Sequence, residues 1–213
     1  MIREKRWFPI LYMFLVTFFF STLIIGFSRF TGQRVEANRQ LAFESAVLSV
    51  LPDWSLRPAS RSEIHRLFHE RIRPPDSATA GAYTMLQNGE ILAYILPVSG
   101  QGFWAPIHGV IGLQPDGRTV TGIAFYEQNE TPGLGAEIAK ESFRQQFSGL
   151  RIAEEGPPLR IKRPDAALEK NEVHAVTGAT QTSTRLEKII NAALAQWRQQ
   201  KSGAAAEKQD ETR

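Results

Sequence analysis

The sequence predicts an α+β protein with one N-terminal transmembrane helix followed by a single domain, in which helices flank an antiparallel sheet. Three observations lead to this prediction. A long apolar run without charge lies near the N-terminus, hairpin signals separate strand-like segments in the middle, and a one-sided apolar stripe of helical period lies near the C-terminus. The length of 213 residues fits one ordinary domain plus an anchor.

The composition excludes several classes of protein. The chain is 42% hydrophobic and 22% charged, and it has no cysteine, which excludes disulfides, thiol nucleophiles and cysteine-ligated clusters. Four scattered histidines predict no transition-metal site. Residues 1–6 (MIREKR) carry +2 of the formal charge of +3, so the rest is nearly neutral and a nucleic-acid partner is not expected.

The apolar run covers residues 7–27 and follows the short N-terminal tail, residues 1–6. As a helix it would be about 30 Å long, which matches the hydrocarbon core of a bilayer. A cleaved signal peptide is the rival interpretation, but the apolar part is too long and the following SRFTGQR lacks a small-x-small cleavage site. We therefore expect an uncleaved anchor in the lipid bilayer. Basic residues flank both ends, so charge alone leaves its orientation open.

Two helices are expected before the sheet, in a juxtamembrane segment over residues 28–75. Residues 35–51 have helix-forming composition and stop at Pro52, and residues 61–71 precede Pro74 and Pro75. Four strands of an antiparallel meander should follow, because an Asn-Gly and a Pro-Asp-Gly turn each separate two strand-like segments. The strands are expected at residues 82–87, 90–98, 104–113 and 118–125.

The second half of the domain, taken as residues 76–199, should return to helices. Residues 136–147 have helical composition, and residues 159–163 form a short strand candidate after a Gly-Pro-Pro breaker. The clearest element is a helix over residues 183–199, since its apolar residues repeat at i, i+3, i+4, i+7, i+8 and i+11. Residues 200–213 are polar and of low complexity, and we expect a flexible tail there.

Two motifs and one aromatic segment could carry function. Residues 130–135 (ETPGLG) contain two glycines that permit close approach of the backbone to a flat ligand, although an ordinary strand-to-helix loop would read the same way. Residues 177–183 (TGATQTS) open the C-terminal helix, where free N–H groups favour a phosphate, although a Ser/Thr cap is the simpler interpretation. Gly102-Phe103-Trp104 and His108 would ordinarily be packing residues of a strand, and His174 an exposed or capping residue.

Taken in this order, the anchor, the G-F-W segment, F-Y-E-x-x-E-T-P-G-L-G and T-G-A-T-x-T-S resemble one family. It comprises the FMN-binding subunits of two respiratory complexes, NqrC of the Na⁺-translocating NADH:quinone reductase (Nqr) and RnfG of the Rnf complex. The resemblance extends over about residues 1–200 and leaves the choice between the two complexes open. It also supports the flanked-sheet arrangement.

The resemblance implies a covalent FMN, joined by a phosphoester bond to Thr180 by a separate flavin transferase that uses FAD and Mg²⁺. An unaided threonine hydroxyl is a poor nucleophile, which agrees with an external enzyme. The family usually has Asp six residues before this threonine, whereas this sequence has His174, and Thr182 and Ser183 are fallback acceptors. The implied cofactor-binding residues are Trp104, Glu130, Thr131, Gly133, Leu134, Gly135, Thr177, Gly178, Ala179, Thr180 and Thr182.

The resemblance further implies an electron-transfer subunit in the bacterial inner membrane, with the flavin domain on the extracytoplasmic side and the other components of the complex as partners. No catalytic residue and no metal ligand are expected. Two alternatives stay open: a flavin-free regulatory or assembly protein of the same fold, and an FMN-dependent reductase supplied with electrons by a membrane partner.

Overall fold

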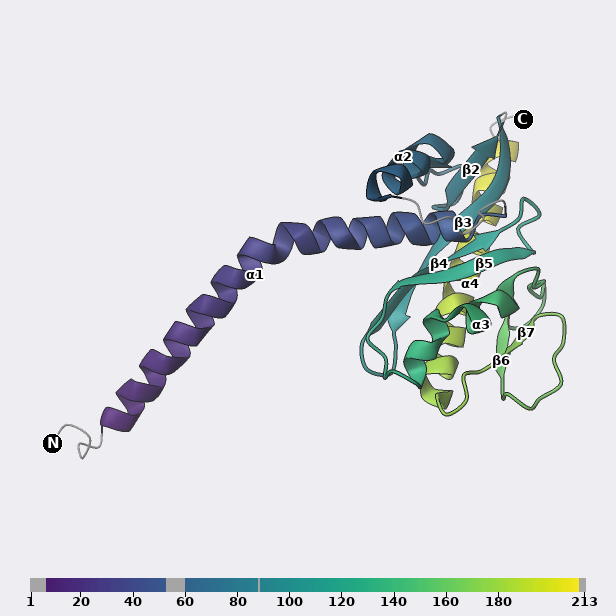
Figure 1. The fold of residues 1–213 in the computed structure, drawn as a ribbon. Coiled ribbons are helices and arrows are strands. Elements are labelled where there is room, and N and C mark those ends of the chain that lie inside the picture. Colours follow the sequence, from purple (N-terminus) through teal and green to yellow (C-terminus); the bar gives the residue numbers. More distant parts are fainter. Residues whose placement is uncertain (1–6, 53–59, 88, 211–213) are drawn as a thin grey trace. The chain divides into compact units, whose positions relative to one another are not determined.

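The structure is a computed structural model that describes residues 7–52, 60–87 and 89–210. The chain divides into two compact units, Met1–Gln40 and Leu41–Arg213. The first helix, α1 (Phe8–Ser49), runs without a break from the first unit into the second (Figure 1). The predicted anchor and the predicted helix at residues 35–51 are therefore parts of one helix, because no Gly or Pro pair interrupts the helical backbone between them.

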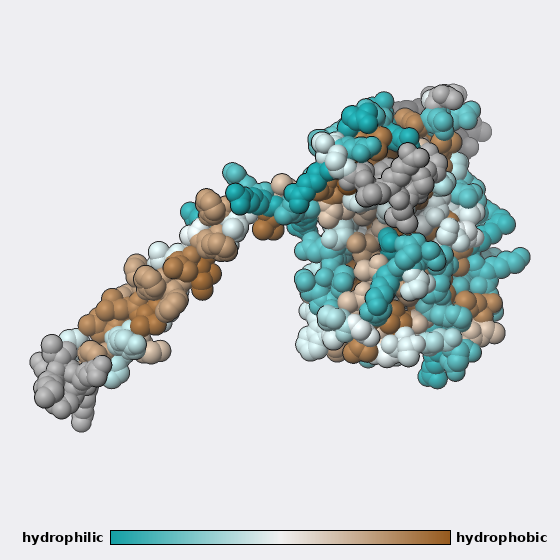
Figure 2. Space-filling model, viewed as in Figure 1, coloured by the Kyte–Doolittle hydropathy of each residue, from teal (hydrophilic) through white to brown (hydrophobic). Residues whose placement is uncertain are grey.

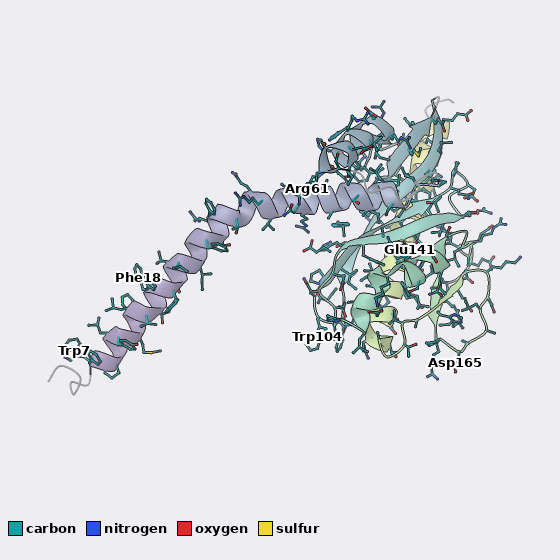
Figure 3. All side chains as sticks on the ribbon, in the orientation of Figure 1. Trp7, Phe18, Arg61, Trp104, Glu141 and Asp165 are labelled. Atoms are coloured by element: carbon teal, nitrogen blue, oxygen red, sulfur yellow. The ribbon has the colours of Figure 1, made fainter. Side chains whose placement is uncertain are left out.

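The first unit is a stretch of apolar helix. Its large side chains are exposed over their whole circumference, among them Ile10 (74%), Phe18 (61%) and Phe27 (68%). Figure 2 and Figure 3 show these apolar side chains along the helix. A helix that is apolar on all sides and unburied suits a lipid environment. Among the described residues, α1 is the one helix long and apolar enough to cross a membrane.

The second unit is built around a five-stranded antiparallel sheet in the order β1-β2-β3-β4-β5 (Figure 1). The strands are β1 (Ile72–Arg73), β2 (Tyr83–Gln87), β3 (Glu90–Gln101), β4 (Pro106–Leu113) and β5 (Val120–Glu127). The predicted meander is confirmed, and the turn before β5 has Gly117 at φ +66° as its sequence requires. Asn88 of the other predicted turn lies outside the described residues.

Helices cover both faces of this sheet. On one face, α4 (Thr180–Asp210) and the short helices after β5 enclose the larger apolar core, in which Leu186, Ile190 and Leu194 are fully buried. On the other face, the last turns of α1 and α2 (Arg61–Arg71) enclose a second core around Ile95 and Val110. Alternate residues of each strand supply the two cores, which confirms the predicted α+β class with a helix-flanked sheet.

Two helix predictions differ from the structure. The predicted helix at residues 136–147 is three short pieces, η2 (Gly135–Ala139), α3 (Glu141–Arg144) and η3 (Gln145–Phe147). Lys140 has an extended backbone (φ −71°, ψ 148°), which breaks the helix between the first two pieces. The C-terminal helix also begins earlier and ends later than predicted, at Thr180 and Asp210.

A small parallel sheet lies beside α4. It pairs the predicted strand β6 (Arg160–Lys162) with β7 (Glu172–His174), which the sequence did not predict. The side chain of Asn191 on α4 accepts from the Leu159 N–H and donates to the Leu159 carbonyl, at 2.9 and 2.8 Å. Glu187 accepts from the Ile161 N–H at 2.6 Å. Helix side chains thus satisfy the backbone edge of β6 that faces away from β7.

Candidate functional site

The first motif, residues 130–135, connects β5 to η2 as a tight loop. The Thr131 carbonyl accepts from the Leu134 and Ala136 N–H groups, both at 3.1 Å, which closes the turn. Gly133 has φ +75°, a conformation that glycine adopts without strain. The loop therefore has a defined shape, and the side chain of Leu134 remains 43% exposed.

The second motif, residues 177–183, forms the start of α4. Gly178 turns the chain at φ +77°, and the Ala179 carbonyl accepts the first helical hydrogen bond, from the Ser183 N–H at 3.0 Å. Thr180 is the first residue of the helix and is exposed, whereas Thr182 (3%) and Ser183 (2%) are buried. The Ser183 hydroxyl accepts from the Val176 N–H at 3.3 Å. Among these three hydroxyls, that of Thr180 is the accessible one, and it lies at the helix end where N–H groups lack intrahelical partners.

The Glu130 side chain joins three segments that are far apart in the sequence. It is 5% exposed, and its Oε2 accepts from the Thr182 hydroxyl at 2.7 Å. Its Oε1 accepts from the Trp104 N–H at 3.1 Å. One buried carboxylate therefore connects the β5–η2 loop with the start of α4 and with the turn between β3 and β4. Hydrogen bonds to a charged group are stronger than those between neutral groups, which favours this connection.

Glycine makes room for the Glu130 carboxylate on two sides. A Cβ at Gly102 would lie 2.5 Å from Glu130 Oε1, and a Cβ at Gly135 would lie 2.8 Å from Oε2 and 2.6 Å from Thr182 Oγ1. A third close approach joins the two motifs, since a Cβ at Gly178 would lie 3.0 Å from Leu134 Cδ2. Any larger residue at these positions would push the motifs apart. Gly102 is one residue that sequence reasoning did not place in the site, although its position before two aromatics was a signal.

Two aromatic side chains of the β3–β4 turn are exposed beside this site. Phe103 is 45% and Trp104 66% exposed, and their rings meet edge to face with centroids 5.0 Å apart. Figure 3 labels Trp104 at this end of the sheet. The sequence-based interpretation of these residues as packing residues of a strand is wrong, because they lie in the turn before β4 begins. Exposed aromatic rings provide flat apolar surface that a planar ligand could cover.

A cleft of about 320 Å³ lies where the first motif faces the segment before α4. Its volume is at the lower end of the range for small-molecule sites. One carboxylate reaches it, that of Glu137, which is paired with Lys140. Four of its residues come from the broken helix after β5, whose course the sequence did not reveal. The lining residues are Gly133, Glu137, Ser142, Phe143, Gln146, Ala175, Val176 and Thr177.

His174 lies in β7 and is half-buried, so the expectation of an exposed or capping residue is wrong. Its backbone N–H donates to Gln146 Oε1 at 2.8 Å, and its Nε2 lies 3.0 Å from the Ala166 carbonyl. These contacts hold β7 against η3 and the loop after β6. His174 therefore contributes to the fold that carries the helix start.

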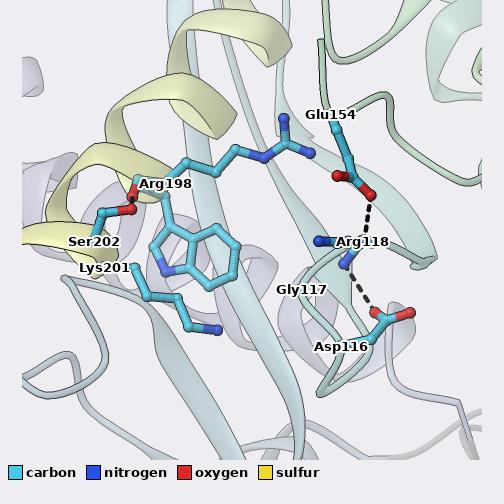
Figure 4. A pocket seen from close by; sticks show the side chains of 8 residues that line it. Asp116, Gly117, Arg118, Glu154, Arg198, Lys201 and Ser202 are labelled. Carbon is cyan, nitrogen blue, oxygen red and sulfur yellow. Dashed lines mark hydrogen bonds and ion pairs between the residues drawn. The ribbon is translucent and has the colours of Figure 1, made fainter. Parts of the chain in front are cut away.

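A second cleft, of about 430 Å³, lies between the turn before β5 and the C-terminal half of α4 (Figure 4). Arg118 and Glu154 form an ion pair in it. Burial alone would raise the pKa of Asp116, but hydrogen bonds from the Thr119 hydroxyl and two backbone N–H groups outweigh it and leave that pKa below its ordinary value. Burial and the nearby Arg118 lower the pKa of Arg198, and Glu154 opposes them. None of the eleven cofactor-binding residues implied by the sequence lines this cleft.

Comparison with known proteins adds a family to this geometry. Residues 102–195 match the FMN-binding domain family, and this range contains all three segments that meet at Glu130. The C-type component of the Na⁺-translocating NADH-quinone reductase of Vibrio vulnificus is 37% identical over 110 residues, 50% of this chain and 43% of the relative. The corresponding component of Neisseria meningitidis is 33% identical over 156 residues, 68% and 58% of the two chains. The chain thus spans about half the length of these curated relatives.

Two solved structures share the fold. The corresponding component of the Na⁺-translocating NADH-quinone reductase from Parabacteroides distasonis has a TM-score of 0.66 at 22% identity and covers 81% of this chain and 96% of its own. NqrC from Shewanella oneidensis has a TM-score of 0.65 at 18% identity, with 79% and 99% covered. The matched residues include both motifs and the aromatic turn, so the resemblance expected from the sequence is confirmed. The chain belongs to the family of FMN-binding proteins that includes NqrC of the Na⁺-translocating NADH-quinone reductases.

Proposed function

We propose that this chain is a membrane-anchored electron-transfer subunit that carries FMN through a phosphoester bond to Thr180. FMN supplies reversible redox chemistry that no side chain of this protein provides. The observation that supports the attachment residue most directly is the difference in burial along the start of α4. Thr180 is exposed at the helix end, whereas Thr182 and Ser183 are buried and hydrogen-bonded.

The residues present fit a flavin phosphate at this place. The N–H groups of the first turn of α4 can stabilise the phosphodiester anion. Leu134 and Trp104 offer exposed apolar surface for the flavin ring, and Gly178 keeps the backbone close to Leu134. The buried Glu130 holds these segments in register and exposes no charge to the flavin phosphate.

Attachment requires an external flavin transferase, because no base lies within hydrogen-bond reach of Thr180 among the described contacts. Thr180 Oγ1 would bond to the FMN phosphorus of FAD, the phosphoanhydride bond would break and AMP would leave. The transferase and its Mg²⁺ would accept the hydroxyl proton and stabilise the leaving group. The chain itself needs to supply only an accessible hydroxyl on a fixed helix end.

The names of the relatives support an Nqr-type complex as the setting, in which the chain passes electrons between neighbouring redox components. The exposed apolar helix supports anchoring in the bacterial inner membrane. We place the flavin domain on the extracytoplasmic side, as the resemblance implies. Protease added to intact spheroplasts should therefore cleave the domain, and protection of the domain would contradict this orientation.

The decisive experiment is coexpression of the full chain with a flavin transferase. The protein should then show flavin fluorescence in a denaturing gel and gain the mass of one FMN less one water. Thr180→Ala should abolish both signals, and Thr184→Ala, an exposed threonine one turn further along α4, should keep them. An unlabelled wild-type protein would refute the proposal and favour the flavin-free alternative. Reduction of a soluble acceptor without partner proteins would favour the reductase.

A further inference from the structure

Three possible metal ligands meet at the junction of α1 and α2. Glu44 lies on the last turns of α1, and His65 and His69 lie on α2. His65 Nδ1 is 3.0 and 3.1 Å from the two Glu44 carboxylate oxygens, and the two imidazole rings are 4.4 Å apart between centroids. One ligand atom from each residue can be chosen so that all three lie within 4.8 Å of one another.

The secondary structure places these residues together without a metal. His65 and His69 are four residues apart on one helix, so their side chains project from the same face. The face of α2 that carries Phe68 is buried, and the Phe68 ring packs against Phe43 of α1 with centroids 6.0 Å apart. This packing fixes α2 beside the turn of α1 that carries Glu44. The ligands therefore stand on two helices that the apolar core already holds in position, as a preorganised site requires.

Burial differs across the cluster in the way that a metal site needs. The Glu44 side chain is 1% exposed, whereas that of His65 is 61% exposed. A buried carboxylate is costly unless cations or hydrogen bonds compensate its charge, and a bound metal ion would add to that compensation directly. The exposed imidazoles can rotate, and solvent can reach the open side of the cluster to deliver an ion and a water ligand.

The donor set selects the kind of ion. Two imidazoles and one carboxylate suit Zn²⁺ and similar transition-metal ions, with water in a fourth position. Mg²⁺ and Ca²⁺ prefer oxygen ligands throughout. With metal–ligand distances of about 2.0–2.2 Å, tetrahedral ligand atoms lie roughly 3.4 Å apart. The separation between His65 Nδ1 and Glu44 is already close to this value, and the imidazole of His69 needs to move by about 1 Å.

We propose that Glu44, His65 and His69 bind one divalent transition-metal ion, for which Zn²⁺ is the probe. The ion would link the last turns of α1 to α2 and hold the two helices together at this edge of the domain. The site is separate from the residues proposed to hold FMN, and nothing in the proposal requires flavin. Its binding can therefore be measured on the flavin-free chain, independently of the proposed electron transfer.

The test uses the full chain in detergent, produced without a polyhistidine tag and stripped of metal with a chelator. Titration calorimetry with Zn²⁺ should show one site, and Co²⁺ should give the visible absorption of a tetrahedral N/O site. Zn²⁺ at about 100 times its dissociation constant should raise the melting temperature by roughly 5–10 °C. His69→Gln should weaken Zn²⁺ binding at least about tenfold, the range seen when even outer-shell partners are lost.

His108→Gln is the matched control. His108 lies in β4, where its Nδ1 is 2.8 Å from the Ser99 hydroxyl, and its replacement should leave Zn²⁺ affinity unchanged. His69 is exposed, so its replacement should leave the metal-free circular dichroism spectrum unchanged. Equal affinity in the wild type and His69→Gln, or an equal loss in His108→Gln, would overturn the proposal. A wild-type chain that gives no tetrahedral Co²⁺ spectrum would do so without reference to any variant.

Discussion

Replacement of Thr182 by valine tests whether the buried carboxylate of Glu130 holds the site together. Valine has nearly the shape of threonine, so the change removes the hydroxyl and little else. The lost contact is the 2.7 Å hydrogen bond from Thr182 Oγ1 to Glu130 Oε2, and both residues are at most 5% exposed. Glu130 would keep its other contact, the Trp104 N–H at 3.1 Å.

The magnitude follows from burial and charge. A hydrogen bond to a charged group contributes about 1.5–3 kcal/mol, and the carboxylate left behind cannot recover it from water. For a domain of this size each kcal/mol shifts the melting temperature by about 2–4 °C. Thr182→Val should therefore lower the melting temperature by roughly 3–12 °C. It should also lower flavin attachment at Thr180, because the start of α4 loses its tie to the β5–η2 loop.

Thermal unfolding of the full chain in detergent measures this effect, with tryptophan fluorescence as the signal because Trp197 is 3% exposed in the core. Thr184→Val is the matched control, since Thr184 is exposed on the same helix and should change the melting temperature by less than about 2 °C. If the two variants melt at the same temperature, Glu130 does not stabilise the site in the way we describe.

Two further predictions concern the helix start and the turn before β5. Gly178→Ala should destabilise the domain by about 1–2 kcal/mol from its positive φ, as should Gly149→Ala, measured by urea unfolding. Only the former should also lower flavin attachment, because its Cβ meets Leu134 while a Cβ at 149 meets nothing; equal labelling of the two would contradict this. Asp116→Asn should lower the melting temperature at pH 7, because the Asp116 pKa lies below its ordinary 3.8, and the difference should vanish as pH falls through about 4 and below; a difference unchanged at pH 3 would refute it.

The sequence predicted the elements whose signals are local. Helix α2 has the predicted bounds, since Ser60 caps its start and accepts from the Glu63 N–H, while Pro74 prevents its continuation. The strands β2 to β5 follow from turn residues and alternation, and the stripe around Leu186 and Trp197 predicted the buried face of α4. These patterns depend on neighbours within a few residues, so they can be read without knowledge of the fold.

The predictions that differ depend on contacts between distant segments. The helix after β5 is interrupted at Lys140, although its residues have helical composition. The strand β7 exists because β6 lies beside it, and its three residues carry no independent signal. The exposure of Trp104 could not be predicted from a strand-like composition, because it depends on where the turn between β3 and β4 begins.

The site itself was predicted in its members more than in its connections. Both motifs and the aromatic turn were identified from the sequence, and the structure brings them together. The role of Glu130 as their common hydrogen-bond acceptor depends on residues that are 26 and 52 positions away. The cluster of Glu44 with His65 and His69 was hidden for the same reason, because the helix pair that forms it is separated by a loop in the sequence.

The polar side chains that α4 offers to β6 have a consequence for how copies of this protein coexist. A two-stranded sheet normally has two open borders, and each is a template on which a second molecule could build a strand. Here Asn191 and Glu187 occupy the hydrogen-bonding positions of Leu159 and Ile161 along one of those borders. Molecules crowded in the plane of a membrane would meet often, and this border gives them no free backbone on which an aggregate could start.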